Sequence, residues 1–222
     1  MILNLSSKSV IFLLSLSILG VVGSSGLAYG ETITLDASAG KTIRDSSGSN
    51  FCNSSSLTDQ STANWINGRL YSTGTANRDC ERQTGQWSLV GIPDNAIITD
   101  VDYSYTISSV TNGRACNVYP LTYDVSAATL SQLFSDARDG TPYISNNSDC
   151  LTTGSKSYDL GADADSALQS ALTTTDRFGL GFTYFDEALT STSRTTITSG
   201  SGTLVVTYTL PLPTITINDI SI

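Results

Sequence analysis

Carboxylates are the main candidates for chemistry in this chain, because its sequence contains no histidine. Without an imidazole, the chain cannot form a Ser-His-Asp site, a Cys-His site, or a zinc or haem site that uses histidine. Catalysis would need two converging carboxylates, as in a glycosidase. The glutamates are Glu31, Glu81 and Glu187, and only Asp186 adjoins one of them, although adjacent strand residues point to opposite faces. The sequence therefore predicts a protein that is not an enzyme.

Three aspartates in one short segment form a candidate cation site. Asp159, Asp163 and Asp165 offer the hard oxygen ligands that calcium prefers, and extracellular calcium is abundant enough to fill weak sites. The spacing of an EF-hand loop and its closing glutamate are missing. Alternatively, Asp163 or Asp165 caps a following helix and interacts with its dipole. Calcium is thus a candidate cofactor, and helix capping is the competing interpretation.

A second group of residues has the chemistry of sugar recognition. Such sites stack aromatic rings on sugar rings and hold the hydroxyl groups with amide, acidic and guanidinium side chains. The candidate ligand-binding residues are Trp65, Tyr119, Asn117 and Arg114. Core and surface positions are equally open for Trp65, which has asparagines on both sides. Trp87 lies in an apolar segment, so we expect it in the core.

The four cysteines indicate disulfides and therefore export. Cys52, Cys80, Cys116 and Cys150 are an even set and lie too far apart for the close ligand pairs of a structural zinc site. Three pairings are open; we favour Cys52–Cys80 and Cys116–Cys150, because each pair lies beside a turn-rich stretch. Asn53 and Asn146 begin acceptor sequences for N-glycosylation in polar segments that we expect at the surface.

Residues 1–30 have the pattern of a secretory signal peptide. Lys8 is their only charge, Val10 to Val22 form an apolar run, and Ala28-Tyr-Gly30 places small residues before a cut. The alternative is an uncleaved anchor, but the run is shorter than the roughly 20 residues of a spanning helix. Nothing later in the sequence has that length. We therefore expect a secreted or cell-surface protein with no membrane span in the mature chain.

The composition limits the partners. The chain has 222 residues, with 11 basic and 20 acidic side chains and a net charge of −9. This acidic excess argues against a nucleic-acid partner, because phosphate binding needs clustered lysine and arginine. Only 14% of the residues are charged, against roughly 25% in ordinary soluble domains. Together with abundant serine and threonine, these values suit a secreted, β-rich surface.

Alternating apolar and polar residues predict the strands that would position these groups. The clearest strands are 100–110, 178–185 and 203–210, and weaker ones are 32–37, 65–71, 87–90, 118–125 and 195–198. Two short helices are expected, one capped by Ser126 and ending at Gly140, the other capped by Asp163. Segment 46–63 is a long surface loop. We predict one all-β domain over 31–210, an antiparallel β-sandwich of jelly-roll type with one or two short helices.

The order of these elements resembles the DNRLRE-type secreted domains. The resemblance is carried by Thr32-Ile-Thr-Leu-Asp-Ala37, by Trp87-Ser-Leu-Val-Gly-Ile-Pro-Asp-Asn-Ala-Ile-Ile-Thr-Asp-Val101, and by Phe178-Gly-Leu-Gly-Phe182 with Gly202-Thr-Leu-Val-Val-Thr-Tyr208. It covers most of residues 31–210, but the family's name-giving hexapeptide is absent and the four cysteines are additions. The resemblance implies a β-sandwich of the carbohydrate-binding-module type on a cell surface.

Residues 211–222 form a Pro-containing linker and a β-prone tail. Pro211 and Pro213 end the last strand, and the tail beyond them has isoleucines at alternating positions. It is either a strand donated to a neighbouring subunit, an extension of the last strand, or the start of a further domain. We therefore expect an extracellular adhesion module whose partner is a polysaccharide or a cell-surface component. The alternative is a structural subunit of a surface filament that self-associates through this C-terminal strand.

Overall fold

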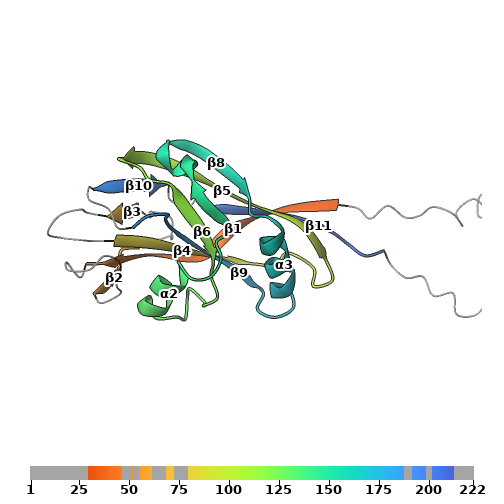
Figure 1. The fold of residues 1–222 in the computed structure, drawn as a ribbon. Helices are drawn as coiled ribbons and strands as arrows, with labels where there is room; N and C mark the ends of the chain where they lie inside the picture. Colours follow the sequence, from red (N-terminus) through yellow and green to blue (C-terminus); the bar gives the residue numbers. More distant parts are fainter. Residues whose placement is uncertain are drawn as a thin grey trace, which may run out of the picture.

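The computed structural model describes residues 30–46, 52, 56–61, 69–72, 80–187, 192–198 and 202–212. These residues form a curled antiparallel sheet with two short α-helices beside it (Figure 1). The strands are β1 (Gly30–Asp45), β2 (Leu57–Asp59), β3 (Arg69–Ser72), β4 (Cys80–Ser88), β5 (Ile97–Thr111), β6 (Cys116–Pro120), β7 (Ile144–Asn147), β8 (Gly154–Asp159), β9 (Arg177–Tyr184), β10 (Ser193–Ile197) and β11 (Thr203–Thr209). The helices are α2 (Leu130–Asp136), the short 3-10 helix η1 (Ser148–Leu151) and α3 (Ala162–Ala171).

The long strand β1 joins the two sides of the sheet. Its first part, residues 30–36, pairs with β11, and its second part, residues 37–45, pairs with β4. Because β11 pairs with β5, β5 with β10, β10 with β3, and β3 with β4, the hydrogen bonds close a circuit. From this circuit β9, β6 and β7 extend beyond β4. The antiparallel all-β class with few helices is confirmed; the jelly-roll sandwich stays a prediction, because the described strands belong to one connected sheet.

The main core lies inside the curl. The alternation that predicted the central strands holds: Tyr103 and Tyr105 of β5 and Phe182 of β9 are buried, and the Tyr105 ring contacts the other two rings. Trp87 is fully buried, as expected, and its indole N–H donates to the carbonyl of Gly202. Helix α3 adds Leu168, and the other members include Val101, Ile107, Val118, Leu180, Tyr184, Leu204 and Val206. Burial of these side chains is the largest favourable contribution to the fold.

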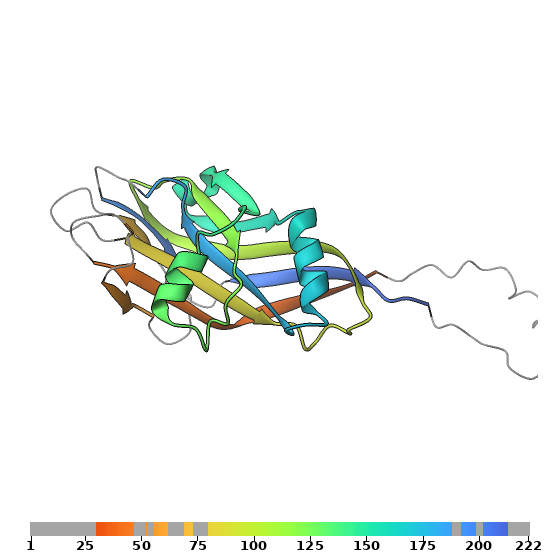
Figure 2. The same ribbon diagram turned by 60° about the horizontal axis from the view of Figure 1, so that its bottom comes forward.

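A second, smaller core lies on the opposite face of β4, beneath α2. It contains Ile43, Cys80, Val125, Leu133 and Phe134. Since β4 separates two cores, all its residues except Ser88 are buried, including polar ones. Helix α2 ends directly over β9, where a Cβ on Gly181 would lie 2.5 Å from the Cα of Ala137. Glycine at position 181 is therefore what lets α2 approach the sheet. In Figure 2, β9 runs between α2 and α3.

Both helices begin at different residues from those predicted. The cap of α2 is Thr129, not Ser126, because Thr129 and Gln132 form a reciprocal capping box. The cap of α3 is Gly161, not Asp163, and Asp163 and Asp165 lie in its first turn. Acidic residues there still interact favourably with the helix dipole.

Several strands also begin or end at residues other than those predicted, because polar segments of the sequence form strands in the structure. Residues 38–45 of β1 and 80–86 of β4 pair with each other, and β7 and β8 were not predicted at all. Strand β2 lies inside the predicted loop 46–63, and β6 ends at Pro120 rather than continuing to Val125. Of the predicted strand 65–71, only the part from Arg69 lies within the described residues. Polar strands lack the alternation on which the prediction depended.

The two ends of the described chain lie side by side. Gly30 at the start of β1 pairs with Thr209 at the end of β11, so both ends of the described chain lie on the same side of the molecule (Figure 1). The predicted signal peptide and the predicted C-terminal strand lie outside the described residues, apart from Gly30 and the linker residues Pro211 and Leu212. None of the helices in the described parts has both the length and the apolar character needed to cross a membrane.

Candidate functional site

The residues predicted to bind a ligand do not come together on an open face. Tyr119 and Asn117 are buried on β6, where the Asn117 amide donates to the Tyr119 hydroxyl at 2.9 Å and its oxygen accepts from the Asn146 backbone N–H. This placement corrects the expectation that they face a ligand, because neither ring nor amide is accessible. Arg114 is exposed and its Nε donates to the Ser193 hydroxyl at 3.4 Å. Trp65 lies outside the described residues.

The predicted calcium ligands are divided between two surroundings. Asp165 is repelled by both Asp159 and Asp100 of β5, whereas Asp163 repels the ionised form of the Tyr143 hydroxyl and so helps to raise its pKa. Asp159 also accepts a hydrogen bond from the Gly161 backbone N–H at 2.7 Å, which supports the turn before α3. The sequence did not indicate Asp100, because it comes from another strand. Calcium binding at these aspartates stays a prediction.

The same cluster of aspartates makes stability depend on pH. Partial burial, followed by repulsion from Asp100 and Asp159, raises the pKa of both Asp102 and Asp165 above the usual 3.8. The folded state then binds protons more tightly than the unfolded state does. These two groups therefore contribute most to stability below their ordinary pKa. That contribution falls as the pH rises through their raised pKa.

Asp102→Asn is therefore expected to raise the thermal midpoint at neutral pH and to weaken its decline between about pH 4 and neutrality. The measurement is thermal unfolding of both proteins across this pH range. Asp94→Asn, an exposed aspartate in the turn between β4 and β5, controls for the change in net charge. An Asp102→Asn variant with an unchanged pH profile would show that neither burial nor repulsion of the Asp102 charge affects stability.

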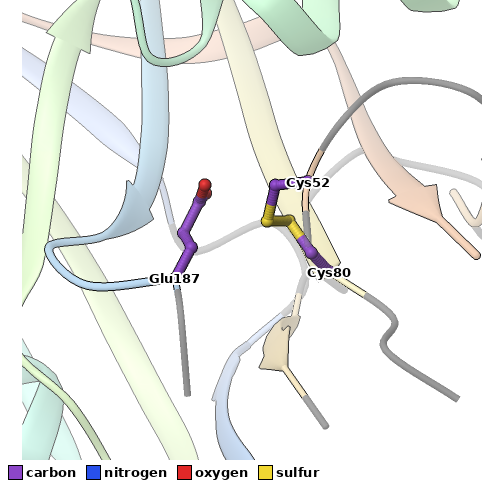
Figure 3. Close-up of side chains that lie close together, drawn as sticks. All are labelled: Cys52, Cys80 and Glu187. Atoms are coloured by element: carbon purple, nitrogen blue, oxygen red, sulfur yellow. A yellow bond between two sulfur atoms is a disulfide. The ribbon is translucent and has the colours of Figure 1, made fainter. Parts of the chain in front are cut away.

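All four cysteines are paired, and the pairing is the favoured one. Cys52 is bonded to Cys80 and Cys116 to Cys150, with Cα–Cα separations of 5.5 and 5.9 Å. The Glu187 carboxylate lies beside the Cys52–Cys80 bond (Figure 3), with its oxygen within 4.8 Å of the sulfur atoms. A metal would need thiolate ligands, so the oxidised pair and Glu187 are not a metal centre.

Glu187 instead belongs to a buried ionic cluster. Arg82 donates to both of its carboxylate oxygens, at 2.9 and 2.8 Å, and Arg138 contacts it at 2.7 Å. The Arg82 guanidinium also donates to the Phe134 carbonyl and lies 4.2 Å from the centre of that ring. Bidentate pairing with this degree of burial gives a strong, directional contact. The cluster fixes α2 to β4 and to the chain that follows β9.

The three glutamates lie in three separate surroundings. Glu81 is buried and pairs with Arg44 at 2.7 Å, Glu187 pairs with Arg82 and Arg138, and Glu31 accepts from the Tyr208 hydroxyl at 2.9 Å. Each of these contacts is one that a structural carboxylate makes. These contacts do not indicate a catalytic pair of glutamates of the kind that a glycosidase uses.

A polar hollow between α2 and the turn after β6 has the composition that a sugar site needs. It encloses about 480 Å³ and is lined by Pro120, Thr122, Tyr123, Ser131, Gln132, Ser135, Asp136, Asp139 and Gly140. Hydroxyl, amide and carboxylate groups predominate, and they can donate and accept hydrogen bonds as sugar hydroxyls require. Tyr123 contributes an aromatic ring, and this residue is 44% exposed.

Asp136 holds the turn that carries Tyr123. Its carboxylate accepts from the backbone N–H groups of Thr122 and Tyr123, at 2.7 and 2.9 Å, and from the Thr122 hydroxyl at 2.9 Å. Asp136 is itself 5% exposed at the end of α2. On the other side of the turn, Gln86 accepts from the Val125 N–H at 2.9 Å. The backbone that carries the tyrosine is therefore held in place without a ligand.

A second hollow lies on the other side of the same turn. It encloses about 230 Å³ between the turn, α3 and the start of β9, and shares Pro120, Thr122 and Tyr123 with the polar hollow. Its lining includes Phe178, which stacks on Tyr143 at 6.1 Å between ring centres. Tyr123 therefore lines both hollows.

One feature of the sequence, Pro120, indicates that Tyr123 lies in a loop. Tyr123 follows Pro120 in a segment assigned to a strand, and proline ends strands, so an exposed loop tyrosine was the better interpretation. The contribution of Asp136 could not be foreseen, because it depends on how α2 packs. Asn146 is exposed, as an acceptor of a glycan must be, and Asn53 lies outside the described residues; glycosylation of both stays a prediction.

Comparison with known proteins places the chain in no family: no family model matches the sequence, and no curated protein is significantly similar to it. The resemblance to DNRLRE-type domains therefore stays a prediction.

Proposed function

We propose that this protein is an exported, non-enzymatic module that binds a polysaccharide through the polar hollow beside Tyr123, and that it serves in attachment at a cell surface. One observation carries the proposal: a half-exposed tyrosine stands at the rim of a hollow lined mainly by uncharged hydrogen-bonding groups. Sugars are recognised by that combination of an aromatic face and directed polar groups.

Three further features support the proposal. The hollow is held by the buried Asp136 carboxylate, so the site does not need to be ordered by its ligand, which reduces the cost of binding. Two disulfides suit a protein that works outside the cell. The glutamates pair with arginines or with a tyrosine hydroxyl, which favours binding over catalysis.

Tyr123→Ala is expected to weaken polysaccharide binding about tenfold, because it removes the aromatic face while leaving the hollow's polar groups in place. The full exported chain is tested by sedimentation with cellulose, chitin, mannan, galactan and starch, and by affinity electrophoresis in soluble polymers.

The matched control is Phe185→Ala. Phe185 is 46% exposed, nearly the same as Tyr123, but it follows β9 and lines neither hollow. This variant should bind as the unaltered protein does. Equal losses in the two variants would place the binding elsewhere, and an absence of binding to every polymer by the unaltered protein would refute the proposed function.

A further inference from the structure

We propose that the polar hollow selects uncharged polysaccharide chains and rejects those that carry carboxylates. This inference rests on the proposed function and adds the class of ligand. The charges that surround the hollow, rather than its shape, support this selectivity.

The charged side chains that line the hollow are both acidic. Asp139 is exposed, and Asp136 is buried with its oxygens occupied by the Thr122 and Tyr123 contacts. Among the described lining residues none is basic. A carboxylate on a ligand would therefore lose water without gaining a cationic partner, which is unfavourable.

The basic side chains near the hollow are directed away from it. Arg138 lies between the two acidic residues in sequence, but its guanidinium contacts Glu187 and donates to the Phe185 carbonyl at 3.0 Å. Arg82 is held by the same glutamate. In the second hollow, Arg177 lies 3.7 Å from Asp124, which offsets its charge. The arginines near the two hollows are thus each paired with a carboxylate, whereas Asp139 forms no ion pair among the described residues.

The expected preference follows from the Coulomb interaction between like charges. Two negative charges about 7 Å apart at a surface of intermediate polarity repel strongly enough to weaken binding about tenfold. The net charge of −9 acts in the same direction at longer range. Because this part is screened by ions, added salt should reduce the discrimination.

The test compares a neutral hexose polymer that the protein binds with the same polymer after its primary hydroxyl groups are oxidised to carboxylates. We expect the oxidised polymer to bind about tenfold more weakly at low salt and to recover part of this loss at high salt. Asp139→Asn should reduce the ratio of neutral-polymer to oxidised-polymer affinity several-fold, because it removes the negative charge from the hollow. The amide keeps the oxygen that accepts from the Gly140 N–H.

Asp94→Asn is the matched control, because it changes the net charge equally but lies in the turn between β4 and β5. It should recover little binding to the oxidised polymer. If the oxidised polymer binds as well as the neutral one, or if both asparagine variants recover binding equally, the inferred selectivity of the hollow is wrong while polysaccharide binding stands. If no polymer binds at all, the proposed function fails, and this inference fails with it.

Discussion

Glu187→Ala is expected to lower the free energy of unfolding by about 3 to 5 kcal/mol, because it leaves two arginines beside an empty position in a low-polarity region. Arg82 is only 7% exposed and pairs with Glu187 through both carboxylate oxygens. Arg138 contacts the same carboxylate. Removing it takes away charge compensation from both guanidinium groups, and the cost of a buried unpaired charge exceeds the loss of the contact alone.

Unfolding by a chemical denaturant measures this loss. Arg177→Gln is the control, because it removes an ion pair to Asp124 that is 3.7 Å long and about one-third exposed on both sides. Such pairs contribute about 0 to 1 kcal/mol. A Glu187→Ala variant that loses no more stability than Arg177→Gln would contradict the structure's account of how α2 is fixed to the sheet.

The second large effect is expected from the Cys116–Cys150 disulfide. Replacing both cysteines with alanine should destabilise the protein by roughly 4 kcal/mol, since the bond closes a loop with a sequence separation of 34. Both residues are buried in the main core, where the Tyr105 hydroxyl lies 3.7 Å from the Cys150 sulfur. The same disulfide joins β6 to η1, so its loss also removes the covalent link between this strand and the helix.

Denaturant unfolding and peptide mapping without reduction test this expectation together. The comparison variant replaces Cys52 and Cys80, whose separation of 28 gives nearly the same chain-entropy term. We expect a similar or smaller loss there, because Cys52 is only partly buried. A loss below about 1 kcal/mol for the Cys116–Cys150 variant, or peptides joined in another pairing, would contradict the structure.

Sequence patterns alone predicted the strands that are buried on one face. In β5, β9 and β11 the alternating apolar residues point into one core, so periodicity alone located these strands. The same reasoning failed for β4, because polar residues such as Arg82 and Gln86 are buried there by partners distant in sequence. No local pattern indicates that a polar side chain has such a partner.

The candidate site was harder to predict than the fold. Tyr119 and Asn117 have suitable chemistry for binding sugar, but β6 pairs with strands on both sides and both side chains are covered. Tyr123 became the better candidate only because Pro120 ends β6 and Asp136 holds the following turn. Composition identified the kind of residue needed, whereas tertiary packing determined which tyrosine is exposed.

Amide chemical-shift mapping is the sharpest test of polysaccharide binding at the two hollows lined by Tyr123. An oligosaccharide of a polymer that the protein binds is titrated into the isotope-labelled exported chain. We expect the largest shifts on Thr122 and Tyr123, on residues 131–140 of α2 and the turn after it, and on the start of β9. Shifts concentrated instead around Arg114, or in segments far from both hollows, would show that the polysaccharide binds elsewhere.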